Sequence, residues 1–228
     1  MMGAGFDVRA WLDLLLQKLQ NQFGARLLFC GIQGSFRRGE AHAQSDIDLV
    51  VVLDRLTPAD LQVYQRFVRS MPFSQKACGF IAGAAEVRAW PRHDLWTLYH
   101  DTEPLFGDLA SLLPALDGCD AEQAVRIGAA DLYHAACHSF LFGNREENLS
   151  GLCKSAYFVL RSIAFLHTGQ YPADTAAMRV ALVGQDRALL DACLAMRTGS
   201  ATDMGIDRLY AQLIDWCGLL LRELSGQE

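Results

Sequence analysis

The sequence predicts a chain of two parts, an α+β (or α/β) domain built on a small mixed sheet over residues 1–116 and an all-α four-helix bundle over residues 117–228. In the first part, short aliphatic runs bounded by glycine or polar residues alternate with amphipathic stretches, which is typical of a sheet covered by helices. In the second part the apolar spacing is helical throughout, and glycine and proline mark the breaks between helices.

Elements of both kinds are expected in the first part. The spacing of apolar residues predicts a helix over 6–22 with Asp7 as its cap, and Thr57-Pro58 opens another that ends at Ser70, because proline is tolerated at the first helical position. The other expected elements are strands at 26–32, 47–53 and 77–82, a short helix at 35–39, edge strands at 86–90 and 103–106, and a helical turn at 93–100.

Four helices are expected in the second part, joined by short loops that would make neighbouring helices antiparallel. A linker around 113–118 separates them from the first part. The expected helices span residues 120–142, 146–168, 173–197 and 204–224.

Composition narrows the class of protein. The chain has 228 residues, 51% of them hydrophobic, and we expect no run long and apolar enough to cross a bilayer. The first residues lack the basic start and apolar core of a signal peptide, so we expect a cytoplasmic protein with no membrane partner. A net charge of −6 with only three lysines argues against broad nucleic-acid binding.

The seven cysteines are scattered, odd in number and never arranged as Cys-x-x-Cys. This pattern predicts reduced thiols in the core and argues against a disulfide framework or a zinc site.

The most informative segment runs from Gly34-Ser35 through Arg38-Gly39 to Ser45-Asp46-Ile47-Asp48. Alternate residues of a strand share a face, about 6.6 Å apart at ~3.3 Å per residue, so Asp46 and Asp48 are expected to point the same way while Ile47 enters the core. Two carboxylates so fixed suit a pair of Mg²⁺ ions. Gly34 and Ser35 offer backbone N–H groups and a hydroxyl at a helix start, where phosphate is favoured.

This combination resembles the nucleotidyltransferase superfamily, which includes DNA polymerase β and the aminoglycoside nucleotidyltransferases. The resemblance implies a polymerase β-like fold, with Asp46 and Asp48 as catalytic metal ligands for Mg²⁺, two ions in all. It implies that Gly34 and Ser35 bind the phosphates of an NTP, ATP first among them. Arg38 could contact phosphate or be a solvated helix residue, and Ser45 could orient the metal site or be an ordinary loop serine.

A third carboxylate is usual in that family, and the strand at 77–82 has none. Glu86 is the candidate for this catalytic role, and a surface ion pair with Arg88 is the alternative explanation, which is slightly preferred. Asp94 and Asp101 are poorer candidates.

The second part is similar to the helical domain of kanamycin nucleotidyltransferase and to HEPN domains, through Lys154, Tyr157 and Leu160-Arg161 and through the segment 168–172. The resemblance implies a substrate-binding domain. Lys154 could then reach a nucleotide phosphate, or be a solvated lysine. Arg161 and His167 match the loose Arg-x₄₋₆-His pattern of RNA-cleaving HEPN proteins, although His167 is also well explained as a residue favoured at a helix C-terminus.

The function expected from the resemblance is Mg²⁺-dependent transfer of a nucleoside monophosphate from an NTP to a hydroxyl of a small-molecule acceptor, for example an aminoglycoside-like one, with release of pyrophosphate. Two alternatives remain open. One is a toxin–antitoxin-like module with RNase or protein-modifying activity, and the other is a nucleotide-binding protein that has lost catalysis. The sequence also leaves a homodimer open.

Overall fold

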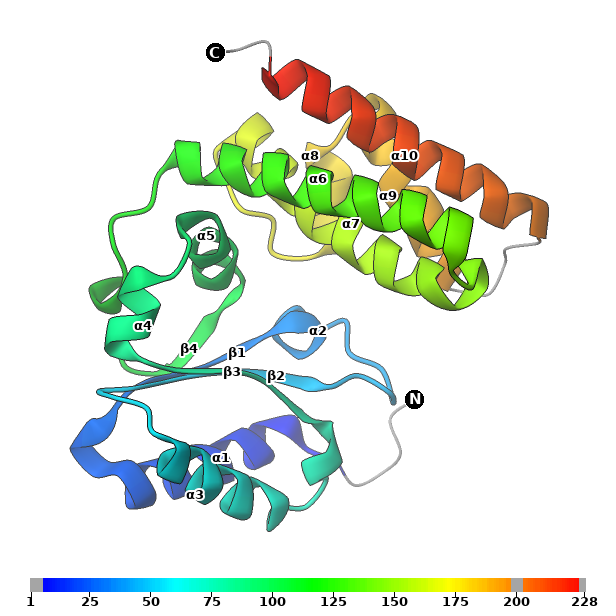
Figure 1. Ribbon diagram of the computed structural model, residues 1–228. Helices are drawn as coiled ribbons and strands as arrows, with labels where there is room; N and C mark the ends of the chain where they lie inside the picture. The colour runs from blue at the N-terminus through cyan, green and yellow to red at the C-terminus, as the bar shows by residue number, and fades with distance from the viewer. Residues whose placement is uncertain (1–5, 198–202, 226–228) are drawn as a thin grey trace. The chain divides into compact units, whose positions relative to one another are not determined.

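The computed structural model describes residues 6–197 and 203–225. The chain divides into two compact units, Met1–Leu116 and Asp117–Glu228. The first holds the sheet with its helices, and the second is helical (Figure 1). A small mixed sheet followed by a helical region is the fold class that the sequence predicts.

The sheet has four strands in the order β3-β2-β1-β4. β1 is antiparallel to both of its neighbours, whereas β2 and β3 are parallel, so the sheet is mixed as expected. The parallel pair is joined across α3 (Pro58–Arg69). The strands are β1 (Leu27–Gln33), β2 (Ile47–Leu53), β3 (Ala77–Gly83) and β4 (Glu103–Phe106).

Helices cover both faces of this sheet (Figure 1). α1 (Val8–Phe23) and α3 pack on one face, against Ile47, Leu49 and Val51 of β2. α4 (Ala84–Ala89) and α5 (Arg92–Asp101) pack on the other, which receives Val50 and Val52. The alternation along β2 thus feeds two cores, and it places Asp48 on the same face as Val50.

Local capping explains where the helices begin. Asp7 accepts hydrogen bonds from the backbone N–H groups of Arg9 and Ala10, as expected for the cap of α1. Thr57 and Asp60 form a reciprocal capping box at the start of α3. Short 3₁₀ segments in the described part of the chain follow α1, α3 and β4: η1 (Gly24–Arg26), η2 (Ser74–Lys76) and η3 (Ala110–Leu112).

The edge strand expected at 86–90 is wrong, because this segment forms α4. Alanine and glutamate are strong helix formers, and the buried residues Ala84 and Val87 lie three positions apart, on one side of a helix. The helical turn expected at 93–100 is confirmed as α5, and the edge strand at 103–106 as β4.

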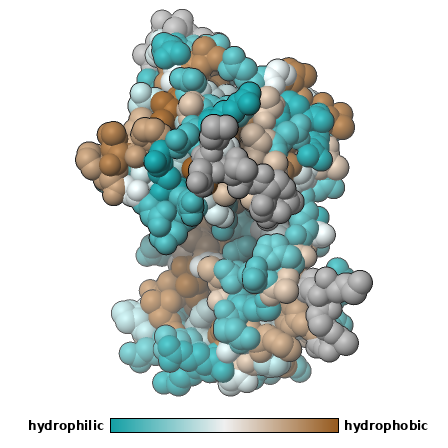
Figure 2. Space-filling model, turned by 90° about the vertical axis from the view of Figure 1, so that its right-hand side faces the viewer, coloured by the Kyte–Doolittle hydropathy of each residue, from teal (hydrophilic) through white to brown (hydrophobic). Residues whose placement is uncertain are grey.

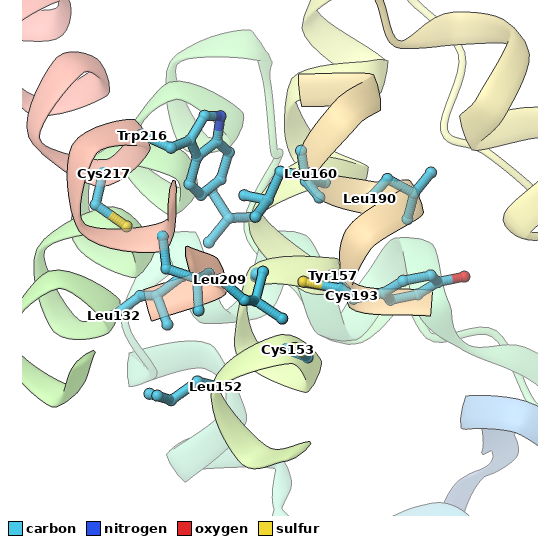
Figure 3. Close-up of a cluster of buried hydrophobic side chains, with 14 of the residues drawn as sticks. Leu132, Leu152, Cys153, Tyr157, Leu160, Leu190, Cys193, Leu209, Trp216 and Cys217 are labelled. Atoms are coloured by element: carbon cyan, nitrogen blue, oxygen red, sulfur yellow. The ribbon is translucent and has the colours of Figure 1, made fainter. Parts of the chain in front are cut away.

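The helix expected at 173–197 is two helices, because Leu182 is extended and Gly184 adopts φ +54°, where glycine alone is unstrained. The buried side chains of this unit form one core, part of which is drawn in Figure 3. Its described helices are α6 (Gly118–Phe142), α7 (Arg145–Thr168), α8 (Thr175–Ala181), α9 (Gly184–Arg197) and α10 (Asp203–Ser225).

By length and composition alone, α7 could span a membrane, contrary to the expectation that no run would qualify. However, 61% of its apolar window is buried inside the protein, which is typical of the central helix of a bundle. On the surface, hydrophobic side chains gather in separate patches between hydrophilic ones on the face that Figure 2 shows.

The prediction that the cysteines are core thiols holds for four of them, since Cys30, Cys153, Cys193 and Cys217 are buried; it is wrong for Cys78 and Cys119, which are exposed, and Cys137 is half-buried. All seven are without disulfide bonds. Burial raises the pKa of Cys30 and of Cys217 to about 12, and a hydrogen bond with the thiol of Cys153, together with burial, raises that of Cys193. These thiols are protonated and unreactive at neutral pH.

Candidate functional site

The residues of the motif lie at one edge of the sheet, the edge formed by the ends of the strands. β1 ends at this edge, and β2, β3 and β4 begin there, because β1 runs against its neighbours while β2 and β3 run together. Asp48 lies between Gln33 of β1 and Cys78 of β3 in the strand register. The short helix α2 (Gly34–Arg37), which begins with the Gly-Ser turn directly after Gln33, is therefore beside the start of β2.

Gly34 lies directly against the carboxylate of Asp48. It adopts φ +71°, and a Cβ added to it would lie 2.0 Å from Oδ2 of Asp48. Both the backbone conformation and the lack of space demand glycine here. The Gly-Ser turn and the second aspartate of the motif thus form one unit, although Asp48 lies 14 positions after Gly34 in the sequence.

Asp46 and Asp48 differ in how they are held. Asp48 is a half-buried residue within β2, and Ile47 before it is fully buried, as expected. Asp46 is exposed and directly precedes the strand, which corrects the expectation that both carboxylates stand on it. Among the described residues no group of three or more metal-ligating side chains forms, so a cation here would rely on these two carboxylates and on substrate oxygens.

The loop before Asp46 is closed by Ser45. Its side-chain Oγ accepts a hydrogen bond of 2.9 Å from the N–H of His42, and its own N–H donates to the carbonyl of His42 at 3.0 Å. Ser45 is buried, so it shapes the turn that leads into Asp46.

Arg38 is engaged by carboxylates of the protein itself. Its Nε donates to Glu40 at 2.9 Å, and its Nη1 lies 3.6 Å from the buried Asp101 at the end of α5. Arg37 lies 3.9 Å from the same carboxylate. A further tie comes from Gln33, whose amide donates to Thr102 Oγ1 at 2.8 Å. These contacts fix the Gly-Ser turn against the end of α5.

Glu86, the candidate third carboxylate, lies at the opposite edge of the sheet. It follows Gly83, which pairs with Leu53 at the far end of β2, and a Cβ on Gly83 would meet its Oε2 at 2.3 Å. The length of β2 separates these edges by about 20 Å at ~3.3 Å per residue. The structure therefore does not bring Glu86 to Asp48. Of the poorer candidates, Asp94 is exposed at the start of α5. Asp101 lies at the same edge of the sheet as Asp48, and its carboxylate is beside Arg37 and Arg38.

The helical unit holds the remaining candidates. Lys154 is exposed on α7. Arg161 is fully buried, where its Nη2 donates to the carbonyl of Pro172 at 2.8 Å and its guanidinium lies 4.5 Å from the ring centre of Tyr171. His167 is exposed in the last turn of α7, so the structure does not present Arg161 and His167 together on a surface.

Lys76 is a residue of this edge that the motif did not indicate. Its ammonium donates to the carbonyls of Ala43 and Ser45, within the loop that leads to Asp46. The scarcity of lysine in the chain was the one feature of the sequence that could have drawn attention to Lys76. The strand register that brings β3 beside β2 cannot be predicted from the sequence.

Comparisons with known proteins bear on the family and the fold of the chain. Residues 13–106 match the family model described as a nucleotidyltransferase domain. The fold resembles the crystal structure of spectinomycin adenyltransferase AAD(9) from Enterococcus faecialis with ATP and spectinomycin, with a TM-score of 0.58 and 16% identity over 90% of this chain and 98% of that one. Curated protein sequences give no match. The Gly-Ser turn and both aspartates therefore lie inside the part of the chain that matches the nucleotidyltransferase family model.

Proposed function

We propose that this protein is a transferase of the EC 2.7.7 type, which moves a nucleoside monophosphate from an NTP to a hydroxyl of a small-molecule acceptor and releases pyrophosphate. The observation that carries the proposal is the fit of Gly34 against Asp48 inside the nucleotidyltransferase domain. The similar enzyme that was solved with ATP and spectinomycin supports ATP as donor and an aminoglycoside-like acceptor.

Asp46 and Asp48 are the proposed ligands of Mg²⁺. Mg²⁺ prefers oxygen and commonly binds through one or two carboxylates plus substrate phosphates and water, so the donor set of this edge fits it. Bound there, two such ions would activate the acceptor oxygen and neutralise charge on the triphosphate. Because residue 34 is glycine, no Cβ at this position overlaps the Asp48 carboxylate.

The other residues are proposed to bind and orient the nucleotide. Gly34 lies next to Asp48, and we propose that Gly34 and Ser35 contact the β- and γ-phosphates. Ser45 would act by shaping the loop before Asp46, and Arg38 by holding the turn against α5. Lys154 stays a proposal as a phosphate ligand from the helical unit. Positioning and charge neutralisation supply most of the rate in phosphoryl transfer.

A nucleotide-binding protein that has lost catalysis is the second candidate. The observation that favours it is that Glu86 lies at the other edge of the sheet, while the carboxylate of Asp101 faces Arg37 and Arg38. An RNase centred on Arg161 is not favoured, because this side chain is fully buried. A cytoplasmic location and a homodimer stay predictions.

The test is the Asp46→Asn/Asp48→Asn double variant. We expect Mg²⁺-dependent ATP binding, measured by calorimetry, and transfer of α-labelled nucleotide to a panel of aminoglycosides to be lost. Asp13→Asn, which changes an exposed carboxylate on α1, is the matched control and should keep both. Transfer that persists in the double variant would refute the assignment. Nucleotide binding without transfer to any acceptor in the wild type would favour the second candidate.

A further inference from the structure

Asp46 needs an anchor outside the sheet. Asp48 is fixed by strand pairing and by Gly34, whereas Asp46 is exposed and lies one residue before β2. Two carboxylates can share a cation only if both are held, since catalytic groups must stay within about 0.5 Å of the productive geometry. The contacts of the loop over residues 40–46 therefore decide where Asp46 lies.

Lys76 supplies such contacts. Its Nζ donates to the carbonyl of Ala43 at 2.6 Å and to that of Ser45 at 3.1 Å. The second carbonyl belongs to the peptide that links Ser45 to Asp46. One ammonium, with three donors, thus clamps the last part of the loop at two points.

Lys76 itself rests on a fixed base. Its N–H donates to the carbonyl of Phe73 at 2.9 Å, and Phe73 adopts φ +55°, a conformation that a bulky residue keeps only when its surroundings enforce it. The ring of Phe73 packs edge-on against that of Phe6, with 4.9 Å between the ring centres. The carbonyl of Pro72 accepts a hydrogen bond of 2.7 Å from the indole N–H of Trp11 in α1. The clamp is therefore tied to the core through α1.

The strand register brings the clamp to the right place. Ala77 and Ile47 are the first paired residues of the parallel strands β3 and β2, and Lys76 and Asp46 directly precede them. We propose that Lys76 is a positioning residue, which fixes Asp46 for metal binding by clamping the loop before it. The inference rests on the proposed function, because it gives Asp46 its role there.

The test measures metal binding as well as activity. Mn²⁺ is titrated into the complex of the protein with a non-hydrolysable ATP analogue and followed by electron paramagnetic resonance. In Lys76→Met, which removes the ammonium and keeps an apolar stem, we expect Mn²⁺ affinity to fall about 10- to 100-fold, as is typical when a partner that orients a metal ligand is lost. Lys18→Met, which removes a partly buried lysine of α1, should bind as the wild type does.

A double-mutant cycle with Asp46→Asn separates positioning from general stability. If Lys76 acts through Asp46, adding Lys76→Met to Asp46→Asn should weaken Mn²⁺ binding little further. Wild-type affinity in Lys76→Met, or fully additive losses in the double variant, would overturn the inference. A wild type that binds no Mn²⁺ with nucleotide would instead refute the proposed function. Should Lys76→Met fail to fold, the shorter and neutral Lys76→Gln replaces it with the same outcomes.

Discussion

Gly34 is the first residue of α2 (Gly34–Arg37) and Gly39 lies just after its end, both with positive φ, so they offer a comparison. Their φ angles are +71° and +69°, so alanine costs about 1–2 kcal/mol of backbone strain at either position. A Cβ at Gly39 meets nothing within 4 Å, whereas at Gly34 it overlaps the Asp48 carboxylate. We expect both Gly34→Ala and Gly39→Ala to lower the free energy of unfolding, Gly34→Ala by more because of this overlap, while Gly34→Ala alone loses Mg²⁺-dependent ATP binding.

Urea unfolding and calorimetry on the two variants check this prediction. Equal loss of ATP binding in both would mean that the conformation of the turn matters and its contact with Asp48 does not. Retained binding in Gly34→Ala would separate the turn from the site.

The start of α3 depends on a carboxylate with a shifted pKa. The guanidinium of Arg26, hydrogen-bonded to both oxygens of Asp60, and the hydroxyl of Thr57 hold the pKa of Asp60 well below its usual range. Folding therefore favours the ionised form of the Asp60 carboxyl group. This contribution to stability is complete above the unfolded pKa of about 4 and is lost as the pH falls below it toward the folded pKa.

Asp60→Asn should therefore destabilise the protein at neutral pH and matter less in acid. We expect the difference in the free energy of unfolding between wild type and variant to be constant from about pH 8 to about pH 5 and to shrink below about pH 4. Urea unfolding across this range measures it. A difference that stays constant down to about pH 2 would show that the ionised carboxylate is not the source.

Elements with a local signal could be predicted from the sequence, and those that depend on distant contacts could not. Asp7 and Thr57-Pro58 are local caps, and the aliphatic run of β2 is a local pattern, so these elements were confirmed. The segment over 86–90 offered only a short apolar pattern, which does not distinguish a strand from a helix. The break at Gly184 was missed because a lone glycine inside a helical pattern is commonly tolerated.

The residues of the candidate site also fall into those with a local sequence signal and those that depend on distant contacts. The Gly-Ser turn and the aspartate pair are close in sequence and were found there. Lys76 reaches the site because β3 returns parallel to β2, and Asp101 because α5 ends beside the turn. Both contacts depend on strand order, which periodicity does not reveal. Glu86 was proposed by sequence proximity to the strand, and the direction of β3 carries it to the other edge.

The molecule as a whole is built around separate cores in its two units. Two buried clusters lie on the two faces of the sheet in Met1–Leu116, and a third lies entirely among the helices of Asp117–Glu228. Multidomain proteins commonly unfold in more than one step. We therefore expect a destabilising substitution in the helical core to lower the stability mainly of the helical unit.

Arg161 is the residue with which to test this expectation, because it is a fully buried cation of the helical core. Arg161→Ala leaves a cavity and removes the donor of the Pro172 carbonyl, and truncation of a large buried side chain typically costs roughly 2–5 kcal/mol. Arg161→Met fills more of the space and should cost less.

Hydrogen exchange read by mass spectrometry should show faster exchange in α6, α7 and α10 of Arg161→Ala, while β1 and β2 keep their protection. An equal loss of protection in the sheet would show instead that the two units unfold as one cooperative body.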